Sequence, residues 1–85
     1  MQNKYSIVMP TMWFASTTIE QLIRLTECDS VGEIIIVNNR ISHTPRHPVL
    51  AHSKIVLLNQ EQNLYVNPSW NLGVQQAKNH AICIA

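Results

Sequence analysis

Blocks of apolar residues recur along this chain with a spacing that predicts strands and helices in alternation. The run Tyr5–Met9 is short and apolar, and we expect a first strand to end at Pro10, which lacks a backbone N–H. The run Glu33–Val37 is β-branched and continuously apolar, which is typical of a strand buried on both faces of a parallel sheet. The first 40 residues therefore predict two strands.

A helix is expected between these strands. Thr17 and Glu20 form a capping-box pattern, in which the threonine accepts from an amide three residues on and the glutamate reaches back. Apolar residues follow at helical spacing, and the helix should run from about Thr18 to Cys28. Strand, helix and strand within about 35 residues predict a βαβ unit with parallel strands and a right-handed crossover. The apolar face comprises Ile19, Leu22, Ile23 and Leu25, with Thr26.

A long loop precedes a further strand, helix and strand. Residues 41–53 hold two prolines and three histidines without a clean period, and one helical turn is expected at Val49–His52. Lys54–Asn59 predicts a third strand, Gln60–Val66 a polar loop, and His80–Ala85 a fourth strand.

The second helix should begin with Asn67 as its N-cap and Pro68 at its first helical position. Its buried face is expected to follow the spacing i, i+3, i+4, i+7. The residues at that spacing are Trp70, Gly73, Val74 and Ala77.

The order β-α-β-loop-β-α-β predicts one α/β domain over residues 1–85, with a Rossmann-like open parallel sheet. The expected strand order is 3-2-1-4, which creates a switch point between strands 1 and 4. Ligands of open α/β sheets bind outside the carboxyl ends of the strands at such a point. Pro10, Thr11, Met12, Asn38 and Asn39 are expected there.

Composition narrows the function classes. A hydrophobic content of 46% with 13% charged residues fits a packed domain. A net charge of +1 favours neither a nucleic-acid surface nor an acidic partner, and no nucleic-acid partner is expected. No apolar run is long enough to span a membrane and no signal-peptide pattern is present, so a cytoplasmic protein is expected. With only two glycines, Gly32 and Gly73, the chain has neither a G-x-G-x-x-G turn nor a Walker loop.

The remaining metal-ligating and thiol residues suggest no site. Cys28 and Cys83 are expected to be buried thiols, although a disulfide is not excluded by sequence. Three histidines lie in the long loop. We expect them to be solvated rather than to bind zinc, because a zinc site needs a fourth ligand. The three histidines are His43, His47 and His52.

Several segments, in order, resemble the family 2 glycosyltransferases, which have the GT-A fold. Tyr5–Thr11 looks like the first strand of that family, and Glu33–Asn39 like its second strand. Asn63, Asn71 and Gly73 match the family's N-x-G-x₇-N-x-G segment in three positions. His80–Ala85 resembles the strand that leads into the family's D-x-D metal motif.

The resemblance implies a domain that binds a UDP- or GDP-sugar. The segment matching Pro10 and Thr11 would contact the nucleoside. Met12, at the end of the same strand, and Arg40, near the predicted cleft, are also expected to contact the ligand. Asn38 or Asn39 stands where the family has an aspartate that hydrogen-bonds the base or ribose. Residues from Asn63 to Asn71 would line the diphosphate and base side.

The chain departs from this family in its charged residues. No D-x-D is present, so the Mn²⁺ or Mg²⁺ of the complete family fold has no motif here, and no catalytic or metal-binding residue is expected. A leaving nucleoside diphosphate needs a cation, and only Arg40 and Arg46 lie near the predicted cleft. The chain alone is therefore expected to lack transferase activity.

Structural roles compete with binding roles at several positions. Asn38 and Asn39 can simply end a strand, and Gly73 is expected to serve close helix–sheet packing. Trp13 and Phe14 can stack on a base or pack under the loop, and Trp70 is expected in the core.

Two hypotheses follow from these observations. The first is the nucleotide-sugar-binding half of a GT-A glycosyltransferase. The alternative is a non-catalytic Rossmann-like interaction module that forms a homo-oligomer, because a sheet cut after its fourth strand leaves an apolar edge.

Overall fold

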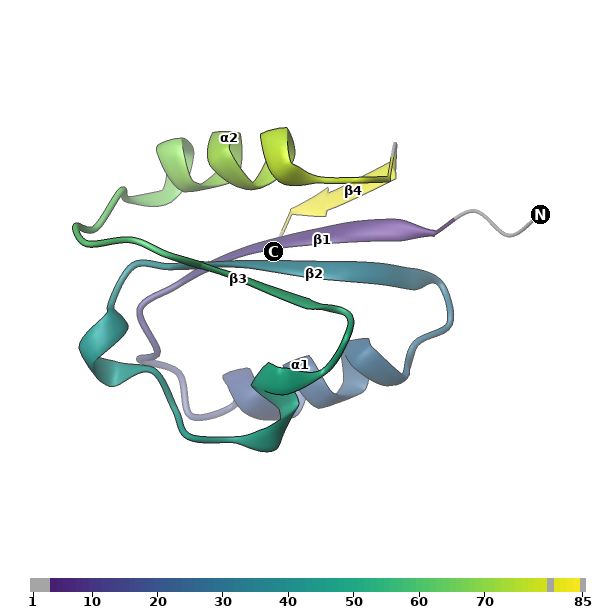
Figure 1. Cartoon of the computed structure of the whole chain (residues 1–85), viewed down its shortest axis with the longest axis horizontal. Coiled ribbons are helices and arrows are strands. Elements are labelled where there is room, and N and C mark those ends of the chain that lie inside the picture. The colour runs from purple at the N-terminus through teal and green to yellow at the C-terminus, as the bar shows by residue number, and fades with distance from the viewer. Residues whose placement is uncertain (1–3, 80, 85) are drawn as a thin grey trace.

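Four parallel strands form one sheet with helices on both faces (Figure 1). The computed structural model describes residues 4–79 and 81–84. The strand order is β3-β2-β1-β4 and every pair is parallel, so the predicted Rossmann-like α/β sheet is confirmed. The elements are β1 (Tyr5–Thr11), α1 (Thr18–Glu27), β2 (Val31–Asn38), β3 (Ile55–Asn59), α2 (Val66–Gln76) and β4 (Ala81–Ile84), with two 3₁₀ turns, η1 (Ile41–His43) and η2 (Pro48–Ala51).

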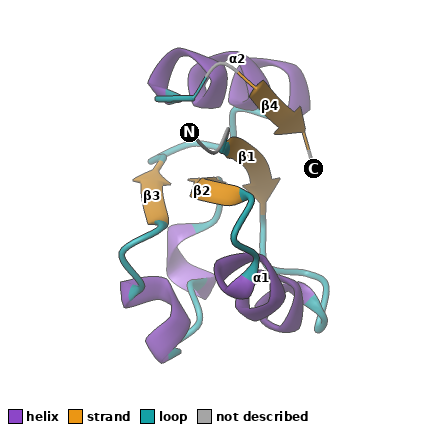
Figure 2. Ribbon diagram, turned by 90° about the vertical axis from the view of Figure 1, so that its right-hand side faces the viewer, coloured by secondary structure: helices purple, strands orange, loops and turns teal. Residues whose placement is uncertain are grey.

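The second strand is the centre of the core. Its residues Ile34–Val37 have no exposed surface, because α1 and η2 cover one face of the sheet and α2 covers the other. Figure 2 shows these two layers on opposite sides of the strands. The cluster on the α1 face consists of Ile7, Met9, Leu22, Val31, Ile34, Ile36 and Val49.

The first helix lies as the spacing predicts. Leu22 is fully buried, and Ile19, Ile23 and Leu25 pack against the core cluster. The predicted capping box is wrong, because the Thr17 side chain makes no cap hydrogen bond and only its carbonyl accepts, from the Gln21 amide.

The second helix starts earlier and is rotated relative to the prediction. Its N-cap is Tyr65, so Asn67 and Pro68 lie inside the first turn. Ser69 and Gly73 are buried against the sheet, whereas Val74 is 40% exposed and Trp70 is half-buried. A β-carbon on Gly73 would lie 2.2 Å from Cγ1 of Val8, so the missing side chain lets the helix approach β1. The predicted packing role of Gly73 is confirmed.

The proline of β1 does not end the strand, which runs on to Thr11. The Thr11 carbonyl accepts from the Asn39 amide, so Thr11 faces β2 and Pro10, one residue earlier, faces the opposite side. Pairing with β4 is described only as far as Val8 with Ile84. The missing N–H of Pro10 therefore removes no ladder bond among the described residues.

Both cysteines are exposed, which contradicts the expected buried thiols. Cys28 lies just past the end of α1. Cys83 lies opposite Ile7 on β4, at the edge of the sheet, whereas α1 packs mainly against β2. Cys83 is exposed because β4 is an edge strand, and local hydrophobicity does not indicate the position of a strand in its sheet. His80 and Ala85, predicted as part of the fourth strand, lie outside the described residues.

A polar network fixes the connection between α2 and β4 at the amino ends of the strands. The Ser6 hydroxyl donates to Oε2 of the buried Glu33 at 2.6 Å, and the Lys78 amide donates to the same oxygen. Asn79 donates to the Ser6 hydroxyl through its backbone and side-chain nitrogens. The buried carboxylate thus has partners from two other segments.

No helix in the described part of the chain has the length and hydrophobicity to cross a membrane.

The contact between Gly73 and Val8 predicts the cost of overpacking. Gly73→Ala should lower the free energy of unfolding by about 2 kcal/mol, measured by urea denaturation, because the new methyl overlaps Val8. Adding Val8→Ala should make the glycine substitution nearly neutral in that background. An equal loss in both backgrounds would contradict the close approach.

Candidate functional site

The carboxyl ends of three strands bring the predicted site residues to one edge of the sheet. Thr11 lies opposite Asn38 in the β1–β2 register, and Asn38 lies opposite Asn59 in the β2–β3 register. The Asn39 amide donates to the Thr11 carbonyl at 3.0 Å, so the pairing continues past the last residue of β2. The predicted neighbourhood of Thr11 and Asn38 is therefore present.

Asn38 is fully buried and its side-chain amide is saturated. Its Oδ1 accepts from Trp13 Nε1 at 2.8 Å and from the Arg40 amide at 3.2 Å. Its Nδ2 donates to Thr44 Oγ1 at 2.7 Å and to Asn59 Oδ1 at 2.9 Å. An amide has two acceptor sites and two donor hydrogens, and all four are used within the protein.

Asn39 and Asn63 hold the loop before α2 against the strand ends. Asn39, also buried, donates from Nδ2 to Ser69 Oγ at 2.8 Å and accepts at Oδ1 from the Leu64 amide at 3.1 Å. Asn63 accepts from the Tyr65 amide at 2.7 Å, and its Nδ2 lies 3.3 Å from the Met12 sulfur. These two side-chain amides therefore fix the end of the loop that leads into α2.

Two neighbouring pockets open on either side of the β1 tip. One has a volume of about 230 Å³ and lies between the β1 tip and the start of α2. The other, of about 300 Å³, lies between the same tip and α1. They share Pro10, Thr11, Met12 and Phe14, and the first is completed by Asn63, Tyr65 and Val66. We call the first pocket the tip pocket; it lies at the carboxyl end of β1, one of the two strands that border the predicted switch point.

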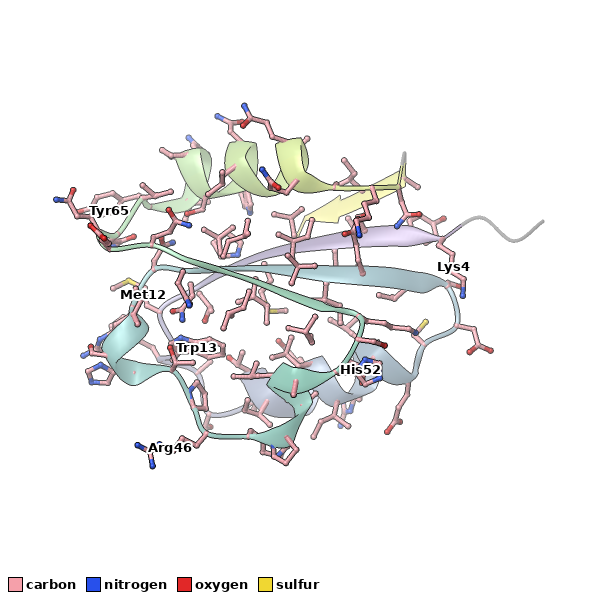
Figure 3. The ribbon with its side chains drawn as sticks, viewed as in Figure 1. Lys4, Met12, Trp13, Arg46, His52 and Tyr65 are labelled. Atoms are coloured by element: carbon pink, nitrogen blue, oxygen red, sulfur yellow. The ribbon has the colours of Figure 1, made fainter. Side chains whose placement is uncertain are left out.

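Aromatic side chains surround the tip pocket. Phe14 and Tyr65 both line it, and they are 75% and 73% exposed. The Arg40 guanidinium carbon lies 4.8 Å from the centroid of the Phe14 ring, in a cation–π contact. Trp13, by contrast, is half-buried against the core cluster, with its indole nitrogen on Asn38. In Figure 3, Met12 and Tyr65 lie near the same end of the molecule.

The predicted site residues therefore divide into three groups. Pro10, Thr11, Met12 and Asn63 line the tip pocket, and Arg40 reaches its rim through Phe14. Asn38 and Asn39 lie beneath it as buried supports. Asn71 is exposed on α2 and lines none of the described pockets. Tyr65 falls within the segment Asn63–Asn71 that the resemblance places at the ligand, but sequence reasoning did not single it out.

The described residues include no group of three His, Cys, Asp or Glu side chains placed to hold a metal ion. The loop histidines use their rings locally: Nδ1 of His47 accepts from the Val49 amide and Nδ1 of His52 accepts from the Lys54 amide.

The saturated amide of Asn38 gives a direct test of its role. Asn38→Asp, which restores the carboxylate of the resembling family, removes both donors and buries a charge facing Asn59 Oδ1. The free energy of unfolding at neutral pH should fall by roughly 3 kcal/mol in urea denaturation.

Asn71→Asp makes the same chemical change on an exposed site and should alter stability by less than about 0.5 kcal/mol. An Asn38→Asp chain as stable as its Asn71→Asp counterpart would mean that the Asn38 amide is free for a ligand.

Comparisons with models of known protein families, with curated proteins and with solved structures found no match to this chain. The functional interpretation therefore depends on the fold and on the residues at its carboxyl edge. Because fold alone does not specify function, the function is inferred from the residues of the tip pocket.

Proposed function

We propose that this chain binds a nucleoside diphosphate, such as that of a UDP- or GDP-sugar, in the tip pocket. The observation that carries the proposal is a pocket at the carboxyl end of β1 in an open parallel sheet, the end of the strands at which such folds bind ligands. Its lining combines apolar and aromatic side chains with a few polar groups, which is typical of small-molecule sites.

The start of α2 and the Arg40 side chain supply the positive charge that a diphosphate requires. The pocket includes Val66, the first residue of α2, and the first amides of a helix attract phosphate through the helix dipole. The Arg40 guanidinium lies beside Phe14 at the rim and offers a planar fork that matches phosphate oxygens. These two features favour an anionic end for the ligand.

The resemblance to family 2 glycosyltransferases supports the same ligand class from the sequence side, through the strand-end segment at Pro10 and Thr11 and the match at Asn63. The proposal concerns binding. No described residue is assigned a catalytic or metal-binding role, and sugar transfer by the chain alone is not part of it.

Calorimetry with UDP and GDP tests the proposal. Saturable binding is expected, and Arg40→Ala should weaken it about tenfold, because a charge-assisted hydrogen bond contributes about 1.5–3 kcal/mol. Arg46→Ala removes the same charge from an exposed loop position away from the tip pocket and should change the affinity less than twofold. Absence of saturable binding at millimolar nucleotide, or equal losses in both variants, would contradict the site.

A second candidate function is self-association, and the edge of β4 favours it. β4 pairs with β1 on one side, and no described strand lies on its other side. The segment Ala81–Ile84 contains neither proline nor charge, the usual protections of an edge strand. A second copy pairing there would extend the sheet across a two-fold axis.

Light scattering at micromolar concentration tests this candidate, with a mass of twice the chain expected. Cys83→Lys places a charge on the edge strand and should restore the monomer, whereas Cys28→Lys, also at an exposed position, should not. A wild-type monomer would contradict self-association through β4.

A further inference from the structure

The side-chain amides of Asn38 and Asn39, which the resemblance places at the nucleobase, are engaged within the protein. Discrimination between bases by hydrogen bonding needs a donor or acceptor free to meet the base edge. All four positions of the Asn38 amide are engaged within the protein, and the residue has no exposed surface. Asn39 is buried and holds Ser69 and the Leu64 amide. The Asn38 amide therefore has no position left for a base, and both polar atoms of the Asn39 side chain already hold the loop before α2 and its first turn.

The flat faces of two aromatic rings are, in contrast, available. Phe14 and Tyr65 come from loops about 50 residues apart in the sequence, and both line the tip pocket while remaining largely exposed. Exposed aromatic rings lose water-accessible surface when a planar ligand stacks on them. The Arg40 guanidinium lies over one face of Phe14, which leaves the other face of that ring for a ligand.

The backbone is strained in both loops that carry these rings, at Tyr65 itself and at Trp13, the residue before Phe14. Trp13 and Tyr65 are the two non-glycine residues with positive φ in the described chain, at 64° and 62°. With ψ at −173°, Tyr65 occupies a region that is almost exclusive to glycine. Its amide is fixed on Asn63 Oδ1, and Trp13 is fixed on Asn38 and Thr11. Both loops of the tip pocket are therefore held in costly conformations that present an aromatic residue.

We propose that a nucleobase stacks in the tip pocket on Tyr65 and on the open face of Phe14, and that the pocket discriminates little between bases. This inference rests on the proposed function, because the same pocket receives the nucleotide. Stacking on aromatic rings tolerates any base, since every base has a π-face, whereas edge hydrogen bonds do not. The substrate class is thus a nucleoside diphosphate of any of the four common bases, with modest preferences set by stacking strength.

Calorimetry on the whole chain with UDP, CDP, ADP and GDP tests this inference. The four dissociation constants should lie within about fivefold of one another. Tyr65→Gly should weaken all four about tenfold or more, which is the loss expected for one stacking contact. Glycine suits the backbone at this position, so the variant should fold at least as well as the wild type. Inorganic pyrophosphate, which has no base, should bind both chains equally.

Two control variants isolate the ring. Tyr65→Phe keeps the stacking face and should stay within twofold of the wild type for every nucleotide. Tyr5→Ala removes an exposed tyrosine from the opposite end of β1 and should have no effect.

The outcomes separate this inference from the proposed function. Preference for one base by a hundredfold or more, or undiminished binding by the Tyr65→Gly chain, overturns face recognition and leaves nucleotide binding in place. Absence of binding by all four nucleotides to the wild-type chain overturns both.

Discussion

Burial of β2 on both faces is the constraint on which the rest of the structure depends. Its four residues Ile34–Val37 are removed from water entirely, which requires a layer on each side of the sheet. The α1 helix supplies one layer, and α2 supplies the other by approaching β1 closely at Gly73. Because all strand pairs are parallel, the carboxyl ends of the strands lie at the same end of the sheet, and the predicted site residues gather there.

At the end of β2 the apolar core is followed by buried polar side chains, and these side chains form their hydrogen bonds within the protein. Asn38 and Asn39 follow directly after the buried run and are themselves buried, so each unpaired polar atom would cost about 1–3 kcal/mol. Their amides instead bind the β1 tip, the loop after β2, β3, and the start of α2. The residues that resemble a ligand-reading position thus serve as the support on which the pocket is built.

Strained backbone and exposed aromatic side chains are concentrated in the loops next to Asn38 and Asn39. The two positive-φ residues, Trp13 and Tyr65, lie in the two loops that flank the tip pocket, and large aromatic faces next to them stay in water. Backbone strain of this kind persists only where surrounding contacts over-determine it, and it clusters at ligand sites. The remaining polar network, around Glu33 and Ser6, lies at the other end of the strands and fixes β4. The two ends of the sheet therefore differ: one holds a buried polar network, and the other holds exposed aromatic rings above buried amides.

Much of the fold follows from local pattern in this chain. The β-branched run at Ile34–Val37 specifies a two-sided strand, and the spacing of Leu22 and its neighbours specifies a helix with one apolar face. The alternation of such elements fixes a parallel sheet, its strand order, and hence the edge at which Thr11 meets Asn38. Gly73 as a packing glycine also followed from the sequence.

Only the tertiary structure decided which side chains at the carboxyl ends of the strands face outward. Asn38 is buried because hydrogen-bond partners from positions 13, 44 and 59 converge on it. Cys83 is exposed because it lies on β4, the edge strand of the sheet. Pro10 stays within β1 because its nitrogen faces away from β2, and Tyr65 joins the pocket through a backbone angle that local preference disfavours. Local pattern reports the average preference of each residue. Orientation at the site depends on which distant segments supply its neighbours, and folding alone brings them together.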